Sequence, residues 1–328
     1  MGMQADEGAA TDNPLIPNER LRQIYLAMAR TLALALRSAR RGQSPAAGTL
    51  GLEAALVSAT ADLGPCDMVS DALAGGVVDF LRGRSLKEVL RAGKAGASAS
   101  RRSRKSGTGV RGLVAECGAA VRLPSTTDAA ERIWAALGAA AALKAAAAQA
   151  RVEDKAKAEV KAKTTDMAAA RQATEARQAG VVVVYALVDE VPAALWKKAL
   201  RFAADQELPV VFVVLPPARE RGGKARAAAK AGGVSALALS CGVPAIVVDA
   251  DDAVAIYRVA QESIGHARIG GGAALMECVP FVLKGAAGKV RVTQDAIAGL
   301  ERTMLQRGVA ARAWMEREAK AFAKRIAK

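Results

Sequence analysis

The chain has 328 residues, 52% of them hydrophobic, so it can form one large α/β domain or two smaller ones with a sizeable core. Its 47 Lys and Arg residues outnumber 32 Asp and Glu residues, and the resulting charge of +15 favours polyanionic contacts without naming a partner. The single histidine, His266, excludes a multi-histidine metal site within the chain, and the four cysteines form no C-x-x-C pair of the zinc or redox type.

The N-terminus carries no signal-peptide pattern, and no apolar run approaches the roughly 20 residues of a membrane span. Scattered cysteines suit a reducing compartment, although a disulfide in the folded chain stays open. We therefore expect a cytoplasmic protein with no membrane partner.

The N-terminal region reads as helical after a polar, proline-bearing arm over residues 1–18. Large apolar residues then recur at steps of three and four up to about Arg41, which predicts a helix with one buried face. These residues are Leu21, Ile24, Tyr25, Met28, Leu32 and Leu36, widened by Leu26 and Leu34. Gly51–Leu63 predicts a second, largely buried helix, and Val77–Leu81 a short further element.

Residues 91–112 are rich in Gly and Ser, contain seven Lys or Arg, and offer almost nothing to bury. This composition predicts a mobile basic loop. Residues 101–105 could contact phosphate, but no aromatic residue is interleaved for base stacking, so a solvated loop is the favoured interpretation.

Ala129–Leu143 predicts an Ala-rich helix with Ile133, Trp134 and Leu137 on one side. It continues into residues 144–178, where strong helix formers alternate in charge and large apolar residues are few. We expect a long exposed helix or a loosely helical insertion. A coiled coil is disfavoured because no heptad of large residues is sustained.

The second half of the chain alternates between β-branched runs and helical segments. Continuous apolar runs are typical of strands buried on both faces of a parallel sheet, and they occur at Val181–Leu187, Pro209–Leu215, Ala245–Val248 and Ala274–Leu283. Helical segments lie between them, at Ala193–Glu207, Ala225–Cys241 and Ala253–Arg268, and the tail from Gln294 is helical with a break near Gly308. This order predicts an α/β fold with a doubly wound, mainly parallel sheet.

The order and the sequences of these segments resemble the alpha subunit of the decarboxylating component of thiamine diphosphate-dependent 2-oxo acid dehydrogenases. Gly51-Leu52-Glu53-Ala54 is similar to that family's G-Q-E-A signature, and the step Cys66–Asp67 follows it as in the family. FAADQELPVVFVV and the stretch from CGVPAIVVDADD to ALMECVPF are similar to its later helices and strands. The resemblance implies one thiamine diphosphate-binding-type domain over 19–328, interrupted by 91–112 and by the insertion 144–178.

The family's cofactor residues are missing from the matching positions. The family holds Mg²⁺ and the diphosphate with G-D-G after the first strand and N-N after the second, because a hard cation needs oxygen ligands and glycines admit backbone N–H groups to phosphate. Here the first position reads Leu187-Val188-Asp189. The second reads Pro216-Pro217, Ala286 stands near the family's phosphate-binding histidine, and no Tyr-Arg pair occurs near 71–73.

Four changes together indicate a degenerate cofactor site. The alternative is a slipped alignment in which Asp189 and Glu190 still hold a metal, with Asp189 as the ligand; a solvated helix start is the simpler interpretation. Asp249, Asp251 and Asp252 are interpreted as caps of the next helix, His266 as a surface or packed residue, and Glu53 as a buried structural acid. No catalytic residue is assigned.

The resemblance implies thiamine diphosphate and Mg²⁺ as the family's cofactors, which we expect this chain not to bind. We expect a structural or regulatory subunit, a homo-oligomer or a partner of a beta-type subunit. We expect the subunit contacts to come from two helices, one with Leu21, Ile24 and Met28 and the other with Ile256, Tyr257 and Ile264. Two alternatives stay open: an active oxidoreductase that decarboxylates a 2-oxo acid or cleaves acetoin with a beta subunit, and a basic polyanion-binding protein using residues 101–105 and 219–230.

Overall fold

A computed structural model describes residues 16–40, 50–70, 77–87, 89, 123, 128–161, 179–216, 233–280, 283–284, 290–291 and 295–327. The predicted basic loop at 91–112 and the polyanion-binding segments at 101–105 and 219–230 lie outside these residues. So do Pro217, Ala286 and positions 71–73. Ile16, at the end of the predicted arm, is fully buried.

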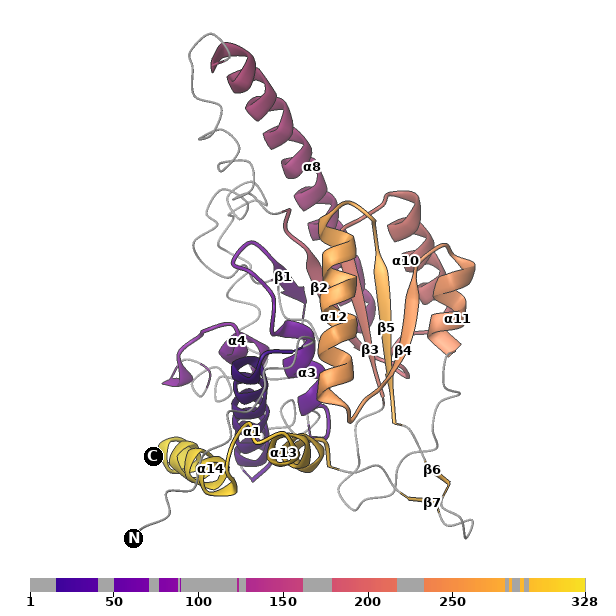
Figure 1. Cartoon of the computed structure of the whole chain (residues 1–328). Helices are drawn as coiled ribbons and strands as arrows, with labels where there is room; N and C mark the ends of the chain where they lie inside the picture. Colours follow the sequence, from indigo (N-terminus) through magenta and orange to yellow (C-terminus); the bar gives the residue numbers. More distant parts are fainter. Residues whose placement is uncertain are drawn as a thin grey trace, which may run out of the picture.

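The centre of the molecule is a parallel sheet in the order β1-β2-β3-β5-β4 (Figure 1). Its strands are β1 (Met68–Ser70), β2 (Val182–Leu187), β3 (Val210–Leu215), β4 (Ala245–Asp249) and β5 (Ala274–Val279). The four β-branched runs of the sequence are thus neighbours in one parallel sheet, as predicted. The runs are apolar throughout because the central strands are buried on both faces.

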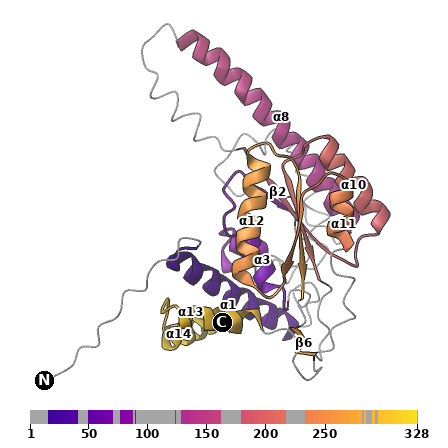
Figure 2. The ribbon, with the colours of Figure 1, turned by 45° about the vertical axis from the view of Figure 1, so that its right-hand side comes forward.

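Helices cover both faces of the sheet (Figures 1 and 2). Helices α3 (Glu53–Thr60) and α12 (Ala253–Arg268) pack with Val183 and Tyr185 on one face. On the other face, α8 (Ala129–Lys161), α10 (Ala193–Asp205) and α11 (Gly233–Ser240) pack with Val182 and Val184. This alternation along one strand confirms the doubly wound α/β fold.

A further layer lies outside α3 and α12 (Figure 2). It consists of α1 (Asn18–Arg40), α13 (Ala296–Gln306) and α14 (Arg312–Ala327), with α4 (Val77–Leu81) beside α1 and α3. The tail helices are interrupted at Gly308, which has a φ of 65°, as the sequence predicts.

Two strand predictions need correction. The strand predicted over 274–283 ends at Val279, and Leu283–Lys284 is a separate strand, β6, paired antiparallel with β7 (Val290–Arg291). Pro280 explains the end, because it has no N–H to donate to a ladder. The three-residue strand β1 was not predicted, since so short a segment shows no periodicity.

The apolar faces assigned to subunit contacts are internal instead. Leu21, Ile24 and Met28 of α1 and Ile256, Tyr257 and Ile264 of α12 are all at most 3% exposed, in one core cluster. Both helices pack against α3, whose eight residues are all buried. The expectation that these faces bind another subunit is therefore wrong.

Helix α8 has two parts. Ile133, Leu137 and Ala140 pack on the sheet, whereas the C-terminal part projects beyond the body and exposes 69% of Val152 (Figures 1 and 2). The exposed helix was predicted, but Trp134 is 42% exposed and packs edge-on against Phe202 instead of joining the core.

Length and composition alone would allow Ala129–Glu153 to cross a membrane. The same stretch is rich in alanine and begins as a packing helix of the sheet, with Ala136 fully buried. Burial against the sheet accounts for the apolar character of this first part.

The amino end of the sheet is fastened by Asp67, whose side chain is 2% exposed. One carboxylate oxygen accepts the N–H of Val181 at 2.9 Å, and the other accepts the N–H of Gly64 at 2.7 Å and pairs with Arg268. Cys66, next to it, is disulfide-bonded, so the bridge that the sequence left open is present. One acid thereby joins the α3–β1 turn, the start of β2 and the end of α12.

Replacing Asp67 with Ala should lower the free energy of unfolding by about 3–5 kcal/mol, because it leaves a part-buried guanidinium and two N–H groups without their acceptor. Urea denaturation measures the change. The matched control is Glu207→Ala, which breaks an exposed ion pair with Lys144 of 3.1 Å and should cost less than about 1 kcal/mol. Equal losses in both variants would contradict the assigned role of Asp67.

Candidate functional site

The two strand ends at which the sequence resemblance places the cofactor motifs meet at the carboxyl edge of the sheet. The N–H of Val188, directly after β2, donates to the carbonyl of Leu215, the last residue of β3, at 2.9 Å. Pro216 follows at once. The structure therefore brings the positions Leu187-Val188-Asp189 and Pro216 together, as a site built from both strand ends requires.

The side chains at this edge are a poor donor set for Mg²⁺ and a diphosphate. Leu187 and Val188 carry no side-chain oxygen, and Pro216 has neither a side-chain oxygen nor an N–H. Of the predicted residues here, Asp189 alone supplies a carboxylate, and it is exposed. A hard cation would normally take several oxygen ligands and bind the phosphates as well.

The neighbouring carboxylate, Glu190, has a protein cation as its partner. Arg132 of α8, whose side chain is 1% exposed, places Nη2 2.5 Å from Oε2 of Glu190. The same oxygen accepts the N–H of Leu187 at 3.2 Å, and Nε of Arg132 donates to the carbonyl of Tyr185 at 3.3 Å. A metal at Glu190 would have to compete with this guanidinium for the same oxygen.

Arg132 was not singled out from the sequence. The sequence feature that could have revealed it is the position of Arg132 on an apolar helix face, next to Ile133 and one turn before Ala136. In the structure all three residues are buried. A charged residue on a buried face needs a partner. The sequence does not show which acid supplies it, since Glu190 lies 58 residues away.

The other acidic candidates have structural roles. Asp252 caps α12 by accepting the N–H groups of Val254 and Ala255 at 3.0 and 2.9 Å, and Asp249 accepts the N–H of Asp251 at 3.1 Å. The predicted capping role is confirmed for Asp252, whereas Asp249 ends β4 and accepts from the turn that follows it. Among the described residues, no three His, Cys, Asp or Glu side chains gather as a metal site.

Glu53 and His266 also behave as the sequence predicts. Glu53 is 4% exposed, and its Oε1 accepts the N–H of Gly51 at 3.1 Å. His266 is half-buried in the last turn of α12, and its ring lies so close to Gly271 that a β-carbon there would come within 2.4 Å of Cε1. Packing accounts for both side chains.

Cys278, on β5, has a thiol of low reactivity. Burial, reinforced by the nearby carboxylates of Glu277 and Asp249, raises the pKa of its thiol to about 12. The thiol therefore stays protonated at neutral pH, whereas the thiolate is the nucleophilic form. Cys241, the other described free cysteine, is only half-buried.

A parallel sheet covered by helices on both faces, with two neighbouring strand ends meeting at its carboxyl edge, defines a doubly wound α/β protein and is consistent with a thiamine diphosphate-binding fold. The family model for "Dehydrogenase E1 component" matches residues 21–328. The chain belongs to this family.

Two curated relatives extend the comparison. The chain is 35% identical over 89 residues to the alpha subunit of acetoin:2,6-dichlorophenolindophenol oxidoreductase of Bacillus subtilis, covering 26% of this chain and 25% of that protein. It is 32% identical over 133 residues to the subunit of the same name from Cupriavidus necator, covering 35% and 38%. The matched parts thus span well under half of each relative.

The two free thiols in the described part of the chain, Cys241 and Cys278, should differ sharply in reactivity. At pH 8 we expect iodoacetamide to modify Cys241 in the native protein and to modify Cys278 only after unfolding, because Cys278 is fully buried and its pKa is about 12. Peptide mass spectrometry after timed labelling measures both rates. Cys241→Ser serves as the control, and rapid native labelling of Cys278 in it would contradict the burial.

Proposed function

We propose that this chain is an alpha-type subunit of the dehydrogenase E1 component family whose own Mg²⁺ and diphosphate site has been lost. In this proposal it acts as a structural or regulatory partner of a beta-type subunit. Membership over residues 21–328 supports the subunit class. The relatives are named as alpha subunits, which implies a further subunit in their enzymes.

The observation that carries the loss of the site is the Arg132–Glu190 pair. The pair closes the loop after β2 with the protein's own cation, at the edge where the family binds its metal. Pro216 at the end of β3 removes the second set of oxygen ligands. Of the residues at the two motif positions, Leu187-Val188-Asp189 and Pro216, Asp189 is the one that carries a carboxylate.

The second candidate is a working oxidoreductase that uses thiamine diphosphate. The observation in its favour is the exposed carboxylate of Asp189 at the carboxyl edge of the sheet. In this case the diphosphate would be bound by groups other than the family's glycines and asparagines.

A cofactor titration separates the two candidates. Thiamine diphosphate with Mg²⁺ should leave the melting temperature of the purified protein unchanged. A ligand at 100 times its dissociation constant stabilises the folded state by about 2.7 kcal/mol, which a melting curve detects readily. A family member with intact G-D-G and N-N motifs is the positive control.

A Mg²⁺-dependent shift would contradict the loss of the site. Asp189→Ala and Glu190→Ala then identify the ligand. If Asp189 is the ligand, its variant loses the shift at unchanged basal stability. Glu190→Ala serves as the structural comparison, because it leaves Arg132 without its carboxylate and should destabilise the apoprotein itself.

The subunit role requires association. The outer strand β4 exposes 39% of Ile246 and 38% of Val247, which is unusual for β-branched residues of a sheet and supports a need for further burial. Light scattering should therefore give a mass above the 33.7 kDa of one chain, alone or with a beta-type chain. A monodisperse monomer in both samples would contradict the subunit role.

A further inference from the structure

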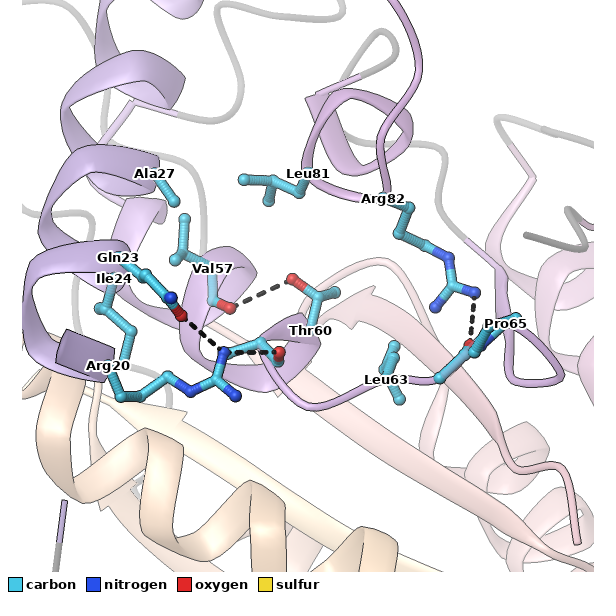
Figure 3. A pocket seen from close by; sticks show the side chains of 12 residues that line it. Arg20, Gln23, Ile24, Ala27, Val57, Thr60, Leu63, Pro65, Leu81 and Arg82 are labelled. Carbon is cyan, nitrogen blue, oxygen red and sulfur yellow. Dashed lines mark hydrogen bonds between the residues drawn. The ribbon is translucent and has the colours of Figure 1, made fainter. Parts of the chain in front are cut away.

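A pocket of about 430 Å³ lies at the amino end of the sheet, away from the carboxyl edge where the family's motifs meet (Figure 3). Its walls come from α1, from the end of α3 with the turn at Gly64–Pro65, and from the end of α4. The turn directly precedes Asp67, which is bonded to the start of β2. The volume falls within the range of small-molecule sites, roughly 300–1,000 Å³.

Two guanidinium groups stand on opposite walls of this pocket, those of Arg20 and Arg82 (Figure 3). Among the described residues that line it there is no acidic side chain. The lining therefore presents guanidinium groups and no carboxylate, which favours an anionic ligand.

Both guanidinium groups are held in place by the protein. Nη2 of Arg82 donates to the carbonyls of Gly64 and Asp67 at 3.0 and 2.7 Å. Arg20 donates to Gln23 at 3.0 Å and pairs with Asp62 at 3.0 Å. Side chains fixed before binding lose little conformational entropy when a ligand arrives.

The remaining lining is largely apolar. Ile24 and Ala27 contribute from α1, Val57 from α3 and Leu81 from α4. Such a surface suits a short hydrocarbon body. It offers a small ion no polar groups to replace the water that the ion would lose on binding.

We propose that this pocket binds a small amphipathic carboxylate, with its head group at Arg82 and its aliphatic body against the α1–α3–α4 wall. A monoanion fits better than a phosphate dianion, because Asp62 offsets the charge of Arg20. The site is independent of the family's cofactor site, since it lies at the opposite end of the sheet.

Hexanoate is the probe, measured by calorimetry and by ligand-observed NMR on the full chain. Hexanoate should bind, 1-hexanol should bind at least tenfold more weakly, and hexylamine should not bind. Arg82→Gln should weaken hexanoate binding roughly ten- to hundredfold, since a charge-assisted hydrogen bond is lost.

Two further variants make the result decisive even if Arg82→Gln disturbs the fold. Ala27→Leu fills the apolar wall, keeps both arginines and should abolish binding at an unchanged melting temperature. Arg201→Gln, exposed on α10 across the sheet, should bind as the parent does. Equal affinity for hexanoate and hexanol, or full binding by Ala27→Leu, would overturn the proposal.

Discussion

The buried carboxylate of Asp67 is the contact on which the amino end of the molecule depends. It binds the N–H groups of Val181 and Gly64 and the guanidinium of Arg268, so one side chain fixes a turn, a strand and a helix end. The turn that it holds supplies a wall of the pocket between α1, α3 and α4. Burying such a charge is tolerated because every contact here is to a donor, two from backbone amides and one from a cation.

The carboxyl end of the sheet is closed by a second arginine–carboxylate pair, Arg132 with Glu190. Strand β1 ends at Ser70, and its ladder with β2 extends only as far as Val184. The carbonyl of Tyr185, the next residue of β2, is taken by Nε of Arg132. The guanidinium thus continues the hydrogen bonding beyond the short strand and meets the acid that follows β2. In this arrangement an internal cation stands beside the strand end at which the sequence resemblance places the first cofactor motif.

These two pairs divide the molecule into regions with different chemistry. The carboxyl edge keeps the family's architecture, with β2 and β3 ending side by side, but presents Leu187, Val188 and Pro216 there. The amino end instead gathers guanidinium groups around an apolar pocket. A sheet that is buried on both faces leaves its two ends as the places where loops meet, and a substitution in those loops changes the chemistry without changing the core.

The sequence by itself determined the fold class and the state of the cofactor motifs. Continuous β-branched runs bury all their side chains only in a sheet that is covered on both faces. That Pro216 offers neither a side-chain oxygen nor an N–H follows from the residue type alone. Whether the apolar faces that contain Leu21 and Ile256 pack inside the chain or against another subunit was decided by the tertiary structure. Periodicity shows that a face is buried, but it does not show which element covers it. Partners distant in sequence, such as Arg132 with Glu190 and Asp67 with Arg268, were likewise decided only by folding, since helix and strand placement brings these charges together. The pocket between Arg20 and Arg82 also arises only on folding. It lies between three helices, and the apolar pattern of each helix does not show that they enclose a cavity together.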